Sequence, residues 1–309
     1  MKKFVAILLT LMLVLGVSGA LAADTESVVI KKAYKLVGAG SSPAETFTLV
    51  QTGSEVTSGD ATAAPALGAI TGAAFDAGAA TADDVTKPIT VSLPNYDRVG
   101  IYEYTLKEVK GNTAGVGYYD AAMKLVVTVV NGENGLERVA AVHTELAQGA
   151  DKSDTFENTY SAGTLTVKKT VTGNLGDKNK EFDFTVTFAA PEGKDWTPAI
   201  TLPTGAGMVE DNPMSYTFKL KHDGTASFGN LPAGVTYTVT EAEVQGYTTT
   251  SAGDKGTIGA GLNEVTFTND KHGEIPTGVT TENLPYVLLI GFVVLAGAAL
   301  LIKRKAHNN

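Results

Sequence analysis

The chain has 309 residues, enough for one large or two medium domains, and a formal net charge of -9 from 24 Lys and Arg against 33 Asp and Glu. An acidic chain without a basic stripe argues against nucleic acid as the partner. The absence of Cys excludes disulfides and cysteine-based catalytic or metal sites.

The first 22 residues have the pattern of a secretory signal peptide. Two lysines precede an apolar run from Phe4 to about Val17, and the small-residue triplet Ala20-Leu21-Ala22 ends it. A membrane helix that stays in place is disfavoured because this run is short. We expect cleavage after Ala22, so that residues 1–22 take no part in the fold of the exported chain.

Most of the remaining chain has the period-two alternation that predicts β-strands. Thr, Val, Tyr and Phe alternate with polar residues, and Gly, Pro and Asn break the runs, which indicates antiparallel sheets with one buried face. A β-sandwich follows, and an α/β enzyme scaffold is disfavoured because helical periodicity is weak outside the termini. The clearest predicted strands are Thr164–Lys169, Phe182–Phe188, Thr236–Glu241 and Glu264–Asn269.

The stretch from Thr52 to Lys87 differs in composition from the predicted strands. It is low in complexity and dense in Ala, Gly, Thr and Asp. We interpret it as a long loop or an insertion in the first domain.

Three short motifs each occur twice in the same order along the chain. An internal repeat of this long period indicates two similar domains, which we place at residues 24–160 and 161–272. The paired motifs are VVIKK ending at Lys32 and LTVKK ending at Lys169, YTLKE ending at Glu108 and YTVTE ending at Glu241, and FEN ending at Asn158 and FTN ending at Asn269.

Strand parity places each of these Lys, Glu and Asn side chains on the face that its apolar neighbours bury. Polar groups in a core are costly unless they satisfy one another. Two ordinary explanations are a buried Lys-Glu pair capped by Asn, and strand-end side chains that reach into water. Repetition of the set in an exported, Cys-free chain favours a functional role instead.

The C-terminal segment predicts membrane insertion. An apolar run over residues 284–302 is long enough to nearly cross a bilayer, and the basic tail 303–309 holds its end on the cytoplasmic side. By hydropathy alone, this segment is equally a plain membrane anchor. The pentapeptide just before it consists of Glu274, Ile275, Pro276, Thr277 and Gly278.

That pentapeptide resembles the sorting motif of Gram-positive surface proteins, which the transpeptidase sortase cuts between Thr and Gly. The order of motif, apolar helix and basic tail is the order that sorting signals have. Glu274 and Ile275 stand where Leu and Pro are usual, which leaves open which sortase reads the motif. A second match, Leu202-Pro203-Thr204-Gly205, is predicted to be a turn because no membrane segment follows it.

With these motifs, the chain resembles the sortase-assembled major pilins of the streptococcal T-antigen type from about residue 28 to its C-terminus. The resemblance implies two immunoglobulin-like domains, each with a spontaneous Lys-Asn isopeptide bond. Lys32 would join Asn158 beside the acid/base Glu108. Lys169 would join Asn269 beside Glu241.

The resemblance also implies how subunits join. Sortase would form an acyl-enzyme with Thr277, and a lysine of the next identical subunit would resolve it, for which Lys152 is the loosely matching candidate. The product would be a pilus on the cell surface, fixed to peptidoglycan after a transient membrane intermediate, with minor pilins and a host receptor as further partners. A monomeric sortase-anchored adhesin is the alternative, and the Thr52–Lys87 stretch is its only candidate ligand segment.

An enzyme with turnover is the least favoured class. The four histidines lack metal-ligand spacing, and no Ser lies in a nucleophile motif, so we expect no metal and no cofactor. Those histidines are His143, His222, His272 and His307.

Overall fold

A computed structural model describes residues 25–83, 85–144, 153–210 and 212–274, and helical residues at 285–286, 288–290 and 292–296. The predicted signal peptide, Lys152, residues 275–278 and the tail 303–309 lie outside the described residues, and the helix predicted at 284–302 is described only in part. None of the helices in the described ranges is long and apolar enough to cross a membrane.

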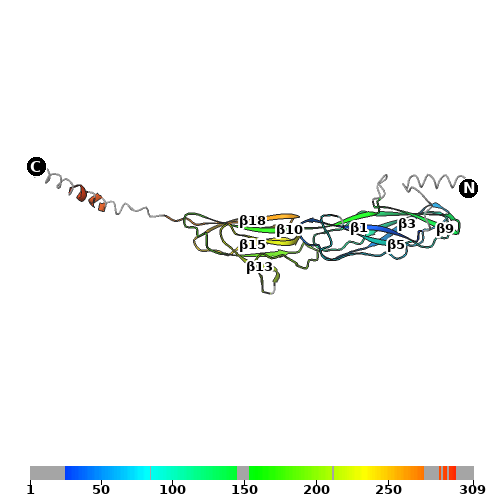
Figure 1. The fold of residues 1–309 in the computed structure, drawn as a ribbon, viewed down its shortest axis with the longest axis horizontal. Coiled ribbons are helices and arrows are strands. Elements are labelled where there is room, and N and C mark those ends of the chain that lie inside the picture. The colour runs from blue at the N-terminus through cyan, green and yellow to red at the C-terminus, as the bar shows by residue number, and fades with distance from the viewer. Residues whose placement is uncertain are drawn as a thin grey trace, which may run out of the picture.

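The described part of the chain is built almost entirely of β-strands, as the sequence predicts. The strands lie along an elongated body, with β1, β3, β5 and β9 toward one end and β13, β15 and β18 toward the other (Figure 1). Thr, Val, Phe and Tyr dominate these strands because their branched or aromatic side chains pack well on a pleated, half-buried surface.

Two facing sheets enclose the first hydrophobic core. Parallel β1 and β10 supply one layer together with β5 and β7, and the antiparallel order β3-β6-β8-β9 supplies the other. The strands are β1 (Ser27–Gly38), β2 (Glu45–Phe47), β3 (Leu49–Gly59), β4 (Ala73–Phe75), β5 (Val85–Ser92), β6 (Gly100–Glu108), β7 (Val116–Gly117), β8 (Met123–Gly132) and β9 (Gly135–His143).

A second core lies between another pair of layers. Here β10 pairs in parallel with β18 and antiparallel with β14, and the facing sheet has the order β12-β13-β11-β15-β17. The strands are β10 (Thr155–Thr172), β11 (Phe182–Ala189), β12 (Gly207–Val209), β13 (Asn212–Leu220), β14 (Thr225–Pro232), β15 (Thr236–Glu241), β16 (Thr248–Ala252), β17 (Lys255–Thr257) and β18 (Gly261–Asp270).

Strand β10 belongs to both cores. Phe156, Tyr160 and Ala162 are buried in the first core, and Leu165 and Val167 in the second. We propose that the domain boundary, expected between residues 160 and 161, lies inside this continuous strand. The last strand of one sandwich is then also the first strand of the next.

The Thr52–Lys87 stretch is not a single long loop, because parts of it form strands. Its first residues continue β3, which pairs with β6 as far as Gly59. Ala73–Phe75 forms β4, and β5 begins at Val85. Small Ala, Gly and Thr side chains give a weak hydrophobic pattern, so pairing with β6 and β2 decides the structure here instead of local sequence.

Backbone and amide contacts join the two cores end to end. The Asn230 side chain accepts from the Ser41 N–H and donates to the Ala199 carbonyl, each at 2.8 Å. Gly38 ends β1 at φ +90°, where an added Cβ would lie 2.2 Å from the Ala162 carbonyl oxygen. The joint therefore requires glycine at position 38.

Candidate crosslink sites

The first site lies between the two layers of the first sandwich. Lys32 comes from β1 and Asn158 from the parallel strand β10, where Phe156 is the register partner of Lys32 and Tyr34 that of Asn158. The two side chains are therefore diagonal neighbours on one face of the sheet. Glu108, the last residue of β6, reaches them from the opposite sheet.

The Glu108 carboxylate bridges the other two side chains. Lys32 Nζ donates to Glu108 Oε2 at 3.1 Å, and Asn158 Nδ2 donates to Glu108 Oε1 at 2.5 Å. Lys32 and Glu108 have side chains with 0% exposure. The Lys32 Nζ also lies 3.9 Å from the ring centre of Phe156 and 4.8 Å from that of Phe47. The amine is thus enclosed by aromatic rings and one carboxylate.

The second site repeats this arrangement in the second sandwich. Lys169 on β10 has Phe267 as its register partner, and Asn269 on β18 pairs with Val171, so the diagonal relation is the same. Glu241 ends β15 in the opposite sheet. Lys169 Nζ donates to both Glu241 oxygens, at 2.9 and 2.8 Å, and Asn269 Nδ2 donates to Oε1 of the same carboxylate.

Burial shifts the ionisation of Lys32, Glu108 and Lys169 toward their neutral forms. Loss of hydration lowers the pKa of Lys32 to about 8, although attraction to Glu108 opposes the change. Burial likewise raises the pKa of Glu108 and lowers the pKa of Lys169. In the first site, both pKa shifts favour transfer of a proton from the Lys32 ammonium to the Glu108 carboxylate, which leaves a neutral, nucleophilic amine.

The sites differ at the carboxamide oxygen of the asparagine. Asn158 Oδ1 accepts a hydrogen bond from the backbone N–H of Tyr119 at 2.8 Å. Asn269 Oδ1 is buried and has no hydrogen-bond partner within the described ranges. Sequence reasoning missed Tyr119, because a backbone donor leaves no signature in the residue type.

Two family models match parts of this chain. Residues 30–161 match the model of a Spy0128-like isopeptide containing domain, and residues 163–271 match a domain of unknown function (DUF7601). A pilin from Streptococcus pyogenes serotype M1 is 30% identical over 235 residues, which are 68% of this chain and 69% of that pilin. The chain belongs to the pilin family.

Solved structures of streptococcal major pilins share the fold of this pilin. One from S. pyogenes has 22% identity and a TM-score of 0.57, and the T3.2 pilin of that species has 22% identity and a TM-score of 0.52. Each match covers 81% of this chain and 100% of the solved chain. The predicted fold class, tandem immunoglobulin-like β-sandwiches, is confirmed.

Membership of this family gives the pilin its general role. It is a structural subunit of a cell-surface pilus, and it assembles with other pilus subunits. Its relatives are structural proteins and not enzymes. A shorter match, 34% identical over 125 residues, is to the S. pyogenes pilus tip adhesin Cpa, of which it covers 18%.

Of the remaining predicted site residues, the structure describes Glu274 alone. Glu274 is exposed after the last described residues of the second sandwich, whereas Ile275, Pro276, Thr277, Gly278 and Lys152 lie outside the described residues. The second motif match at Leu202–Gly205 forms a turn, as predicted, in which the Ala206 N–H donates to the Pro203 carbonyl at 3.1 Å.

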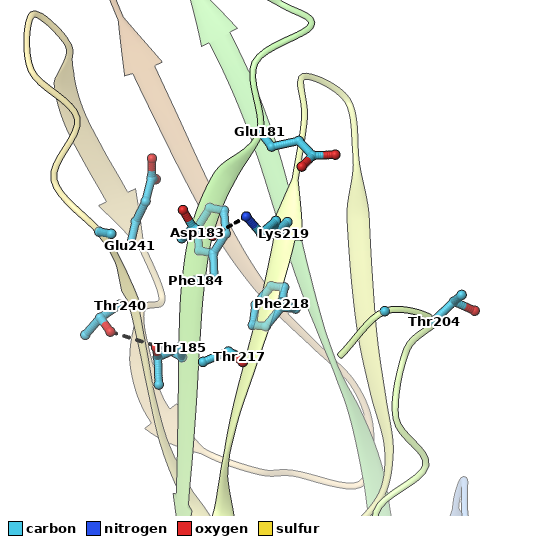
Figure 2. Close-up of a pocket in the computed structure, with 12 residues that line it drawn as sticks. Glu181, Asp183, Phe184, Thr185, Thr204, Thr217, Phe218, Lys219, Thr240 and Glu241 are labelled. Carbon is cyan, nitrogen blue, oxygen red and sulfur yellow. Dashed lines mark hydrogen bonds and ion pairs between the residues drawn. The ribbon is translucent and has the colours of Figure 1, made fainter. Parts of the chain in front are cut away.

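An open hollow on the surface of the second sandwich holds no comparable set of groups. It lies over β11, β13 and β15, with Thr204 on a separate loop across from them (Figure 2). Asp183 and Lys219 form an exposed ion pair at 3.0 Å across its floor. We assign no ligand to this hollow.

Proposed function

We propose that this pilin is a major subunit of a covalent pilus whose two sandwiches each form one Lys-Asn isopeptide bond. Lys32 joins Asn158 with Glu108 as acid and base, and Lys169 joins Asn269 with Glu241 in the same role. The supporting observation is that a buried carboxylate bridges a buried Lys and a buried Asn in both sandwiches with the same strand register.

Each reaction happens once. The neutral Lys amine attacks the Asn carboxamide carbon, and the protonated Glu donates to the departing nitrogen while it accepts the proton that the amine loses. The new amide and one ammonia are the products. Two neighbouring strands hold the reactants together, which replaces an unfavourable bimolecular encounter with an intramolecular step.

Such crosslinks suit a Cys-free fibre subunit. In each sandwich the bond joins the first strand to the last, which are already parallel neighbours. Closing a loop of about 100 residues removes denatured-state entropy worth about 4 to 5 kcal/mol by analogy with a disulfide. An amide also resists the reductants that open disulfides.

Polymerisation by sortase is the second part of the proposal. Thr277 forms the acyl-enzyme, and Lys152 of the next subunit supplies the amine. Export by the signal peptide, a transient membrane stage through residues 284–302 and final transfer to peptidoglycan complete the path. Residues 274–278 support this role by their likeness to a sorting motif.

Polymer ladders from intact cells test this part. Thr277→Ala and Lys152→Arg are each expected to abolish the high-mass ladder on a denaturing gel. Lys178→Arg, at an exposed lysine of the second sandwich, is the control and is expected to leave the ladder intact. An undiminished ladder in the Lys152 variant would mean that another lysine is the acceptor.

A monomeric wall-anchored adhesin is the second candidate, favoured by the match to part of a pilus tip adhesin. The ladder experiment separates the two functions. A wild-type chain that reaches the cell wall only as a monomer supports the adhesin.

A further inference from the structure

The two crosslink sites differ at the carboxamide oxygen of the asparagine. In the first site, the Tyr119 N–H donates to Asn158 Oδ1 at 2.8 Å. In the second, the buried Asn269 Oδ1 has no hydrogen-bond partner among the described residues. In both sites the Lys Nζ and the Asn Nδ2 donate to the Glu carboxylate.

This oxygen is where negative charge develops in the proposed reaction. When the Lys nitrogen pair forms a bond to the carboxamide carbon, the electron pair of the C=O bond moves to Oδ1. The pair returns when the bond from carbon to Nδ2 breaks and ammonia leaves with the proton from Glu. A donor already aimed at Oδ1 stabilises the intermediate without any reorganisation.

The Tyr119 N–H is held in place for such a role. Tyr119 lies in the segment between β7 and β8, outside the strands. Its ring packs against Phe156 with centres 5.3 Å apart, and its hydroxyl donates to the Thr144 carbonyl. Both ends of the side chain are therefore anchored, which fixes the backbone beside Asn158.

We infer that the backbone N–H of Tyr119 is a catalytic oxyanion donor without a counterpart among the described residues of the second site, and that the Lys32–Asn158 bond closes before the Lys169–Asn269 bond. This inference rests on the proposed function. The lysine contacts also favour a slower second bond. Lys169 donates to both oxygens of Glu241, whereas Lys32 donates to one oxygen of Glu108. The ammonium form is thus held more firmly in the second site.

The order of closure is measurable in the unmodified chain. Cell-free synthesis is stopped at intervals in hot detergent, and the crosslinked peptide of each site is quantified after digestion. Since one oxyanion donor contributes about 100-fold to rate, we expect the first bond to form at least about 10-fold faster than the second. Equal rates, or a faster second bond, overturn the inference.

Replacing the peptide bond before Tyr119 by an ester removes the N–H donor alone. The α-hydroxy analogue of tyrosine at position 119 keeps the side chain and replaces the N–H by oxygen. It is expected to slow the first bond about 100-fold and to leave the second unchanged in the same molecules. The same ester at Tyr118 is the matched control, expected to leave both rates unchanged.

The outcomes separate the two levels of the proposal. If both bonds form and the ester at position 119 leaves the first rate unchanged, the donor role is wrong and the proposed function stands. If neither site of the unmodified chain loses ammonia, the proposed function itself fails.

Discussion

Lys32 and Asn158 lie on adjacent parallel strands with an offset of one diagonal step, since Phe156 is the register partner of Lys32 and Tyr34 that of Asn158. Lys169 on β10 and Asn269 on β18 repeat this offset, since Phe267 is the register partner of Lys169 and Val171 that of Asn269. In both cases the side chains meet on the buried face, where a glutamate from the opposite sheet bridges them.

Removal of one glutamate should prevent one bond only. In Glu241→Ala, the intact mass should fall short of the sequence mass by one ammonia instead of two. Loss of the crosslink and of the partner of buried Lys169 should lower the free energy of unfolding by about 4 kcal/mol or more, measured by chemical denaturation.

Glu264→Ala is the matched control for that variant. Glu264 pairs with Lys168 on the same sandwich at 2.5 Å, but both side chains are more than 40% exposed. Such a pair contributes less than about 1 kcal/mol. Two missing ammonias in the Glu241 variant would show that this carboxylate is dispensable.

The rate of the first bond should depend on pH with a bell shape. The reactive pair shares one proton, as neutral Lys32 and protonated Glu108. At low pH the amine stays protonated. Above about 8, where burial places the pKa of Lys32, the pair loses its shared proton and no acid remains to expel ammonia.

The pH dependence of this rate can be measured on chains made by cell-free synthesis and transferred to buffers of different pH. The fraction crosslinked at fixed early times, read by mass spectrometry, should decline on the alkaline side. A rate that keeps rising well above the pKa of Lys32 contradicts the acid role of Glu108.

The joint between the sandwiches should be sensitive to a single methyl group at Gly38. Gly38 has φ +90° and Gly261 has φ +92°, so an alanine meets similar backbone strain at both positions. Only at Gly38 would the Cβ overlap a neighbour, the Ala162 carbonyl oxygen at 2.2 Å, since nothing lies within 4 Å at Gly261. Forcing an extra methyl group into an already packed site costs about 1 to 3 kcal/mol.

Differential scanning calorimetry checks this difference. Gly38→Ala should lower the melting temperature by several degrees more than Gly261→Ala. Equal shifts would mean that the joint adjusts without cost.

The strands and their buried faces were largely predictable, because alternate residues of a strand face the core and each strand therefore shows its own apolar alternation in the sequence. The parity of VVIKK and LTVKK places Lys32 and Lys169 inward, and the structure buries both. The same parity predicts the inward positions of Asn158 and Asn269. Because the motifs repeat in the same order, the sequence also predicted that the Lys and the Asn of each sandwich lie close together.

Other features depend on tertiary contacts that the sequence pattern does not encode. The strand β3 beyond Thr52 is rich in small and polar residues and is held by its pairing with β6. The Tyr119 donor is a backbone group, and the Asn230 contacts join segments far apart in the chain. Residue type alone carries no signal for any of these.

Intact mass spectrometry of the denatured mature ectodomain tests most directly whether Lys32 and Lys169 are covalently joined to Asn158 and Asn269. The mass is expected to fall short of the sequence mass by two ammonias, with one crosslinked peptide recovered from each sandwich after digestion. A mass equal to that of the sequence would contradict the account.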